Sequence, residues 1–127
     1  MSAPSTLPGK ISALLGALGV ALGAFGAHGL KTVLENNQTL SVWQTASQYH
    51  LLHAVVLLCL SWKKSPPAGA FWAMTLGVLV FSGSLYALSV TGIRKLGMIT
   101  PLGGVLLIAG WLLLLKPPPS SGPAPET

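Results

Sequence analysis

The chain has 127 residues, of which 51% are hydrophobic and only 7% are charged, with 7 basic side chains against 2 acidic ones. A soluble domain carries about 25% charged residues, so this composition excludes an ordinary soluble globular protein. The basic residues lie singly or in pairs at the ends of apolar stretches, without the clustered patch of a nucleic-acid-binding protein.

Four stretches of the chain carry no charge, and each is long enough for the roughly 20 residues of a transmembrane helix. They cover residues 11–30, 36–62, 65–93 and 96–115. We therefore predict an all-α integral membrane protein, a bundle of four transmembrane helices at about 7–28, 43–62, 68–90 and 100–115. These helices form a single domain over residues 1–116. A disordered Pro-rich tail is predicted at 117–127.

The first predicted span carries glycines at helical spacing. Steps of 3, 4 and 3 residues place them on one face, and the middle pair forms a GxxxG motif. Such a stripe lets helix backbones approach closely, so we predict a packing seam; the alternative is a face that dimerises or admits a ligand. A cleaved signal peptide is disfavoured because the stretch is long for a signal's apolar core. The predicted helix-packing glycines are Gly16, Gly19, Gly23, Gly26, Gly83, Gly103 and Gly104.

The second predicted span runs between two tryptophans, Trp43 and Trp62. Their separation of 19 residues corresponds to about 28 Å of helix, so we expect them to mark the two membrane interfaces. The following run from Lys63 to Pro67 breaks the helix. At the fourth span, Thr100 and Pro101 predict a helix cap followed by a first-turn proline.

The basic residues between the spans give the orientation. Four lysines, Lys10, Lys63, Lys64 and Lys116, lie on one side of the predicted bundle, and three basic residues, Lys31, Arg94 and Lys95, lie on the other. The positive-inside rule therefore favours a multi-pass protein with both termini in the cytoplasm. Cys59 lies inside an apolar stretch and is expected to be a small buried residue.

Polar side chains inside the membrane are costly and mark the candidate site. The second span holds most of them, and the alternating direction of the helices brings the others to the same end of the bundle. We predict a polar pocket there, with a pair of histidines three residues apart on one helical face. Its candidate residues are His28, Gln44, Gln48, Tyr49, His50, His53, Ser82, Ser84, Tyr86 and Thr100.

Several roles are open for His28, His50 and His53. They can bridge helices through hydrogen bonds to hydroxyls and carbonyls, which is the role we expect. They can instead help to bind a lipid, a quinone or haem. A metal site would need further ligands, and the only nearby carboxylate is Glu35, so no metal site is predicted. Acid–base chemistry is the remaining alternative.

Motifs of membrane enzymes and pumps are missing. The predicted spans contain no Asp or Glu for a proton relay, no arginine ladder, no HExxH and no phosphate loop. We therefore predict a non-enzymatic structural, accessory or assembly component that binds no cofactor. Its expected partners are the lipid bilayer and other membrane proteins or a second copy, and not nucleic acid. The rival hypothesis is binding or transport of a small molecule through the histidine-containing pocket.

The order of several short motifs resembles the domain-of-unknown-function 423 family, small bacterial inner-membrane proteins with an animal transmembrane counterpart. The resemblance covers roughly residues 11–115 and departs in the aliphatic segment 105–109, where an aromatic residue is expected. It implies four helices in a plasma membrane and no particular activity, cofactor or catalytic residue. The motifs are Gly23–Leu30, Trp43–Ala54, Phe81–Tyr86, Thr91-Gly92, Gly97–Gly104 and Gly110-Trp111.

Overall fold

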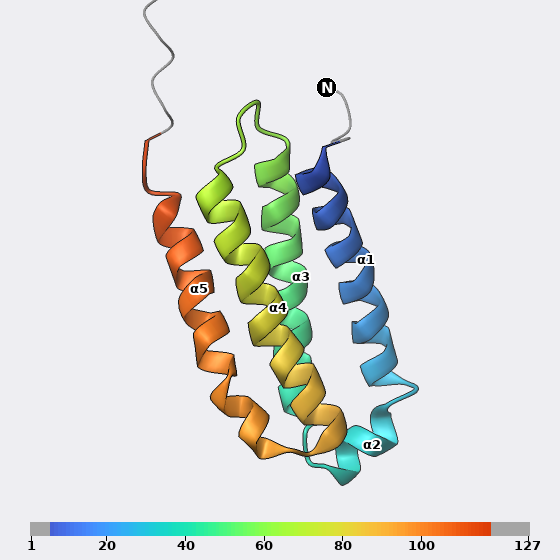
Figure 1. Cartoon of the computed structure of the whole chain (residues 1–127). Helices are drawn as coiled ribbons and strands as arrows, with labels where there is room; N and C mark the ends of the chain where they lie inside the picture. Colours follow the sequence, from blue (N-terminus) through green and yellow to red (C-terminus); the bar gives the residue numbers. More distant parts are fainter. Residues whose placement is uncertain (1–5, 118–127) are drawn as a thin grey trace, which may run out of the picture.

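The computed structural model describes residues 6–117, and all regular structure in that range is helical, which confirms the all-α prediction (Figure 1). Apart from Pro117, the predicted Pro-rich tail lies outside the described residues. The elements are α1 (Leu7–Ala27), α2 (Lys31–Asn36), α3 (Leu40–Ser61), α4 (Ala68–Thr91), the short 3-10 helix η1 (Arg94–Met98) and α5 (Thr100–Leu113).

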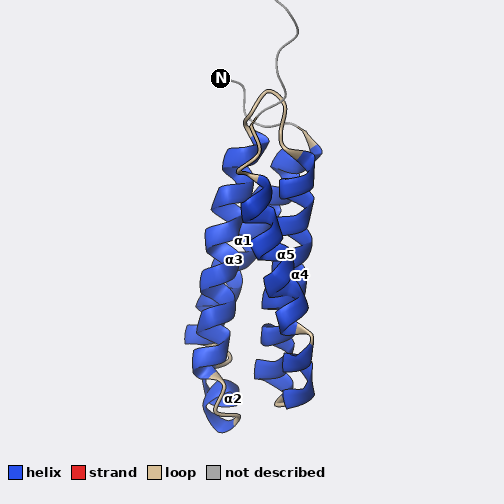
Figure 2. Ribbon diagram, turned by 90° about the vertical axis from the view of Figure 1, so that its left-hand side faces the viewer, coloured by secondary structure: helices blue, strands red, loops and turns tan. Residues whose placement is uncertain are grey.

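The four long helices run up and down in chain order, α1 against α3, α3 against α4 and α4 against α5. The start of α1, the connection between α3 and α4 and the end of α5 lie together at one end of the bundle, which we call the terminal end (Figure 1). Helix α2 lies at the opposite end, the α2 end. Figure 2 shows two layers, α1 with α3 and α4 with α5.

Local chemistry sets the helix ends. The Thr6 hydroxyl accepts a hydrogen bond of 3.4 Å from the Gly9 N–H at the start of α1. Helix α4 ends at Gly92, whose φ of 73° is left-handed and whose N–H donates to the Leu88 carbonyl. The predicted cap at Thr100 is wrong: Thr100 is the first residue of α5, and no side chain caps that helix.

The apolar core lies in the half of the bundle nearer the terminal end. It combines side chains from all four long helices, among them Leu15 of α1, Leu57 of α3, Phe71 of α4 and Leu107 of α5. Leu57 and Phe71 are completely buried. Most hydrogen bonds between helices lie in the other half, so we call the two parts of the bundle the apolar half and the polar half.

Within the described residues, three segments are long and apolar enough to cross a membrane: α1, α4, and the stretch 94–113 that joins η1 to α5. This is one fewer than the sequence predicts. The difference lies in α3, which has 22 residues but carries two glutamines, two histidines and several hydroxyls. The multi-pass membrane character is thus supported by three helices, and α3 lies between α1 and α4.

Candidate functional site

His50 links three helices of the polar half. Its Nε2 lies 2.8 Å from the Leu15 carbonyl of α1, and its Nδ1 lies 2.9 Å from the Tyr86 hydroxyl of α4. A carbonyl can only accept, so Nε2 carries the hydrogen, and in the neutral ring Nδ1 accepts from Tyr86. The side chain is 4% exposed, and both of its nitrogens are occupied.

His53 lies one turn further along α3 and faces another neighbour. The Trp111 Nε1–H of α5 donates to its Nε2 over 3.0 Å, and its Nδ1 lies 2.7 Å from the Tyr49 carbonyl. An indole only donates, so Nε2 has no hydrogen and Nδ1–H donates to the carbonyl. His53 is therefore held as the opposite tautomer to His50, and neither ring keeps a lone pair for haem iron or a metal ion.

His28 does not join the other two histidines. Helix α1 ends at Ala27, so His28 is the residue after the last turn and its side chain is exposed. Its backbone N–H bonds to the Phe25 carbonyl. The predicted grouping of three histidines is thus wrong for His28, because His50 contacts α1 at Leu15, which lies about 20 Å of helix before His28. Within the described residues, no group of three or more His, Cys, Asp or Glu side chains is placed to hold a metal ion.

Trp43 is a structural residue of the polar half, contrary to the prediction that it marks a membrane interface. It is 3% exposed, its indole N–H donates to the Leu22 carbonyl of α1 over 2.9 Å, and its ring lies 4.6 Å from that of Tyr86. Gly26 makes this possible, because a Cβ there would overlap the Trp43 indole. Trp62, at the other end of α3, is 49% exposed, as a residue at an interface would be.

Hydroxyl groups complete the contacts of α4. Ser82 donates to the Ala46 carbonyl of α3 over 2.8 Å, and the Ser84 and Thr100 hydroxyls lie 2.6 Å apart, joining α4 to α5. The sequence-based prediction omits two residues that also form hydrogen bonds to α4, at the α2 end. Thr39 and Asn37 both donate to the Ser89 carbonyl. They were missed because they lie in the connection between the first two predicted spans.

The glycines divide into packed and open positions. A Cβ at Gly19 would lie 2.6 Å from a methyl of Leu51, and one at Gly103 would overlap the backbone of Phe81. At Gly104 the nearest atom, in the Phe81 ring, would be 3.8 Å away, an ordinary contact. Within the described residues, a Cβ at Gly16, Gly23 or Gly83 would meet nothing within 4 Å, so the predicted close packing is wrong there. Packed glycines that the prediction omitted are Gly77 and Gly110.

A groove of about 390 Å³ lies between α1 and α3, toward the α2 end of the bundle; we call it the α1–α3 groove. Gly23 and Gly26 line one wall, and Gln44, Ser47 and Gln48 line the other. Both glutamines are exposed, and neither amide makes a hydrogen bond within the described residues. The Ser47 hydroxyl, which also lines the groove, is buried beside the Tyr86 hydroxyl. Gln44 and Gln48 therefore give the groove two amides without hydrogen-bond partners among the described residues.

Tyr49 is the remaining predicted site residue. It is 43% exposed, and its ring lies 4.7 Å from that of Phe81 and is stacked with that of His53 at 6.2 Å. It lies on the outer surface of the bundle. The predicted pocket thus separates into a closed hydrogen-bonded interior around His50 and His53 and an open groove along Gln44 and Gln48.

The comparisons with known proteins agree with the family resemblance. The family described as "Protein of unknown function (DUF423)" matches residues 22–104. The UPF0382 membrane protein YwdK of Bacillus subtilis is 45% identical over 116 residues, which cover 84% of this chain and 94% of that protein. The UPF0382 membrane protein SH2409 of Staphylococcus haemolyticus is 45% identical over 114 residues, covering 84% and 93%. No solved structure matches. The chain belongs to the DUF423 family of membrane proteins.

Proposed function

We propose that α3 is a fourth transmembrane span, so that the chain crosses the membrane four times with both ends in the cytoplasm. Its 22 residues give about 33 Å of helix, enough for the hydrocarbon core. Its histidines find partners on α1, α4 and α5, which removes most of the cost of polar groups in lipid. The lysine-rich terminal end favours this orientation.

Single cysteines test the topology. Cys59, which is exposed and not buried as predicted, is replaced by serine. Asn36→Cys at the α2 end or Ser65→Cys at the terminal end is then introduced; both sites are exposed. In intact cells, a membrane-impermeant thiol reagent should label the cysteine at 36 and leave the one at 65 unlabelled until the cells are opened. Labelling of both positions in intact cells would contradict a crossing by α3, and the reverse pattern would contradict the orientation.

We further propose that the protein is a non-enzymatic assembly component whose α1–α3 groove receives a helix of a second copy. The amides of Gln44 and Gln48, which are exposed at the groove and have no hydrogen bond to the described residues, carry this proposal. Glycines let helices approach, and glutamines bond across helices in membranes. An amide both donates and accepts, so in a two-fold dimer a glutamine can pair with its own copy.

Two matched glycine substitutions test the dimer. Among the described residues, a Cβ at Gly23 or Gly16 would meet nothing within 4 Å, but only Gly23 lines the groove. Gly23→Leu should weaken association in phosphatidylcholine vesicles about tenfold or more, whereas Gly16→Leu should leave it unchanged. Stepwise photobleaching of the labelled full chain counts the copies. A wild-type protein that is monomeric at every protein-to-lipid ratio would contradict the proposal.

A second candidate function is binding of a small uncharged molecule such as a quinone in the same groove. One observation favours it: the volume of about 390 Å³ lies within the usual range of ligand pockets. In that case Gly23→Leu should abolish binding of a quinone probe without altering the number of copies. Haem is disfavoured, because every ring nitrogen of His50 and His53 has a partner in the protein.

A further inference from the structure

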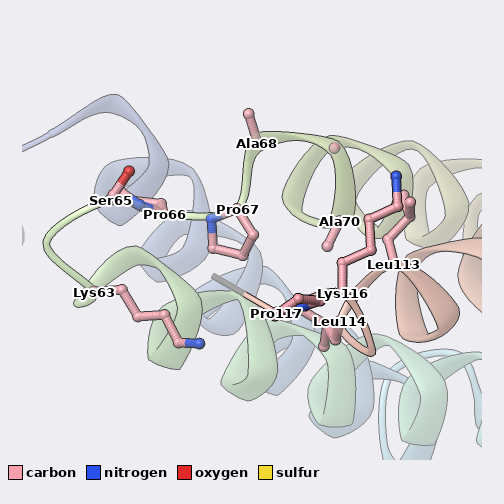
Figure 3. Close-up of a pocket in the computed structure, with 11 residues that line it drawn as sticks. Lys63, Ser65, Pro66, Pro67, Ala68, Ala70, Leu113, Leu114, Lys116 and Pro117 are labelled. Carbon is pink, nitrogen blue, oxygen red and sulfur yellow. The ribbon is translucent and has the colours of Figure 1, made fainter. Parts of the chain in front are cut away.

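A second pocket, of about 480 Å³, lies at the terminal end, where the connection between α3 and α4 meets the end of α5 (Figure 3). We call it the basic pocket. Lys63, Ser65 and the two prolines that follow form one wall, and Lys116 comes from the other side, after α5. The two lysines thus belong to segments more than fifty residues apart in sequence, which the fold brings to one opening.

The positive charge of the basic pocket is not neutralised by the protein's described part. Lys63 and Lys116 are exposed, and the one acidic residue among residues 6–117, Glu35, lies on α2 at the opposite end of the bundle. Lys10 and Lys64 lie at the same end without lining the pocket. Helix α4 also begins here, and the partial positive charge of its first turn has the same sign.

The rest of the lining is apolar and borders the membrane. Leu113 and Leu114 at the end of α5 are half-buried, and Ala70 in the first turn of α4 is buried. The exposed Trp62 directly precedes Lys63, and an exposed tryptophan is typical of the interface between headgroups and acyl chains. A ligand that suits these walls carries a negative group above an apolar body.

We propose that the basic pocket binds the headgroup of an anionic phospholipid, with the phosphodiester between Lys63 and Lys116 and an acyl chain along Leu113 and Leu114. Basic pockets between membrane helices recognise such headgroups by charge, and each lysine near an anionic surface contributes about 1 kcal/mol. The headgroup supplies the counter-charge that the described chain lacks at this end. The site is independent of the α1–α3 groove, which lies at the other end of the bundle.

The experiment compares two pairs of lysines at one end of the protein. Lys63→Gln with Lys116→Gln removes both charges from the pocket, and Lys10→Gln with Lys64→Gln removes the same charge beside it. Native mass spectrometry of the full chain in detergent, with equal phosphatidylglycerol and phosphatidylcholine, measures the ratio of bound lipids. The wild type should prefer phosphatidylglycerol. In the pocket variant, the preference for phosphatidylglycerol should fall about fivefold for each lysine replaced. The control variant should keep the wild-type preference.

Three outcomes would overturn the proposal. Equal losses in both variants would show a diffuse charge effect and no site. The absence of any preference in the wild type would show that the pocket does not select anionic lipid. Displacement of phosphatidylglycerol by millimolar inorganic phosphate would assign the pocket to a free anion. Thermal unfolding of each variant in phosphatidylcholine checks folding, and Gly69→Leu, which fills the pocket without changing charge, should reduce binding of both lipids.

Discussion

Each ring nitrogen of His50 and His53 faces a partner of the opposite hydrogen-bonding character. A carbonyl faces an N–H on each ring, and the second nitrogen accepts from a tyrosine hydroxyl or an indole. This matching fixes one tautomer per ring and removes the rings from metal chemistry. In a membrane, where water cannot replace a lost partner, each of these bonds positions a helix as well as stabilising it.

A double-mutant cycle should detect the hydrogen bond between Trp111 and His53. His53→Phe leaves the indole N–H without an acceptor and should destabilise the protein by about 1–3 kcal/mol. Trp111→Phe removes the donor as well, so the coupling between the two substitutions should be about 1 kcal/mol. Reversible unfolding of the purified chain in mixed micelles measures it. Strictly additive effects would mean that the 3.0 Å contact contributes nothing to stability.

At the scale of helices, glycine serves the contact of α4 with α5 more than that of α1 with α3. Gly77, Gly103 and Gly110 each lie where a Cβ would press on the facing helix, and at Gly103 the obstacle is the backbone of Phe81. A backbone cannot move aside as a flexible side chain can. Helices α4 and α5 therefore form the tightest pair in the bundle.

Two alanine substitutions separate packing from helix propensity. Gly103→Ala should destabilise the protein by about 1–3 kcal/mol, because its Cβ overlaps Phe81. Gly83→Ala on α4 meets nothing within 4 Å and should be neutral or stabilise by about 0.5–1 kcal/mol, since alanine is the better helix former. The same unfolding assay reports both. Destabilisation by Gly83→Ala would contradict open space at this position.

Sequence patterns predicted the ends of the helices well, but they predicted less well which residues of adjacent helices contact one another. The helix-breaking run at Lys63–Pro67 and the apolar stretches place the long helices within three residues at each end. The site required knowledge of rotation about each helix axis, which spacing alone does not give. The stripe of α1 illustrates this: a Cβ at Gly19 or Gly26 would press on a side chain of α3, whereas one at Gly16 or Gly23 would meet nothing within 4 Å among the described residues. Trp111 was missed because its partner, His53, lies 58 residues away.

For the whole molecule, the apolar core lies toward the terminal end and most hydrogen bonds between helices lie toward the α2 end, while His50 and His53 bond to Leu15 and Trp111 where the two regions meet. The apolar half contains the core cluster around Leu57 and Phe71, both of which are completely buried. The polar half ties the helices together through groups that lipid cannot satisfy. The α1–α3 groove belongs to the polar half and the basic pocket to the opposite end, so the two proposed contacts do not compete for the same surface.

The partners of α3 have a consequence for biogenesis, given the four-span topology proposed above. A ribosome makes the chain from its N-terminus, so Leu15 already exists when His50 emerges, whereas Tyr86 follows 36 residues after His50 and Trp111 58 residues after His53. When helix α3 reaches the translocon, two of the four hydrogen-bond partners of its imidazole rings have therefore not yet been synthesised. The cost of its polar groups in lipid falls further as α4 and α5 are released beside it, so the last helix made supplies a hydrogen-bond partner to an earlier one.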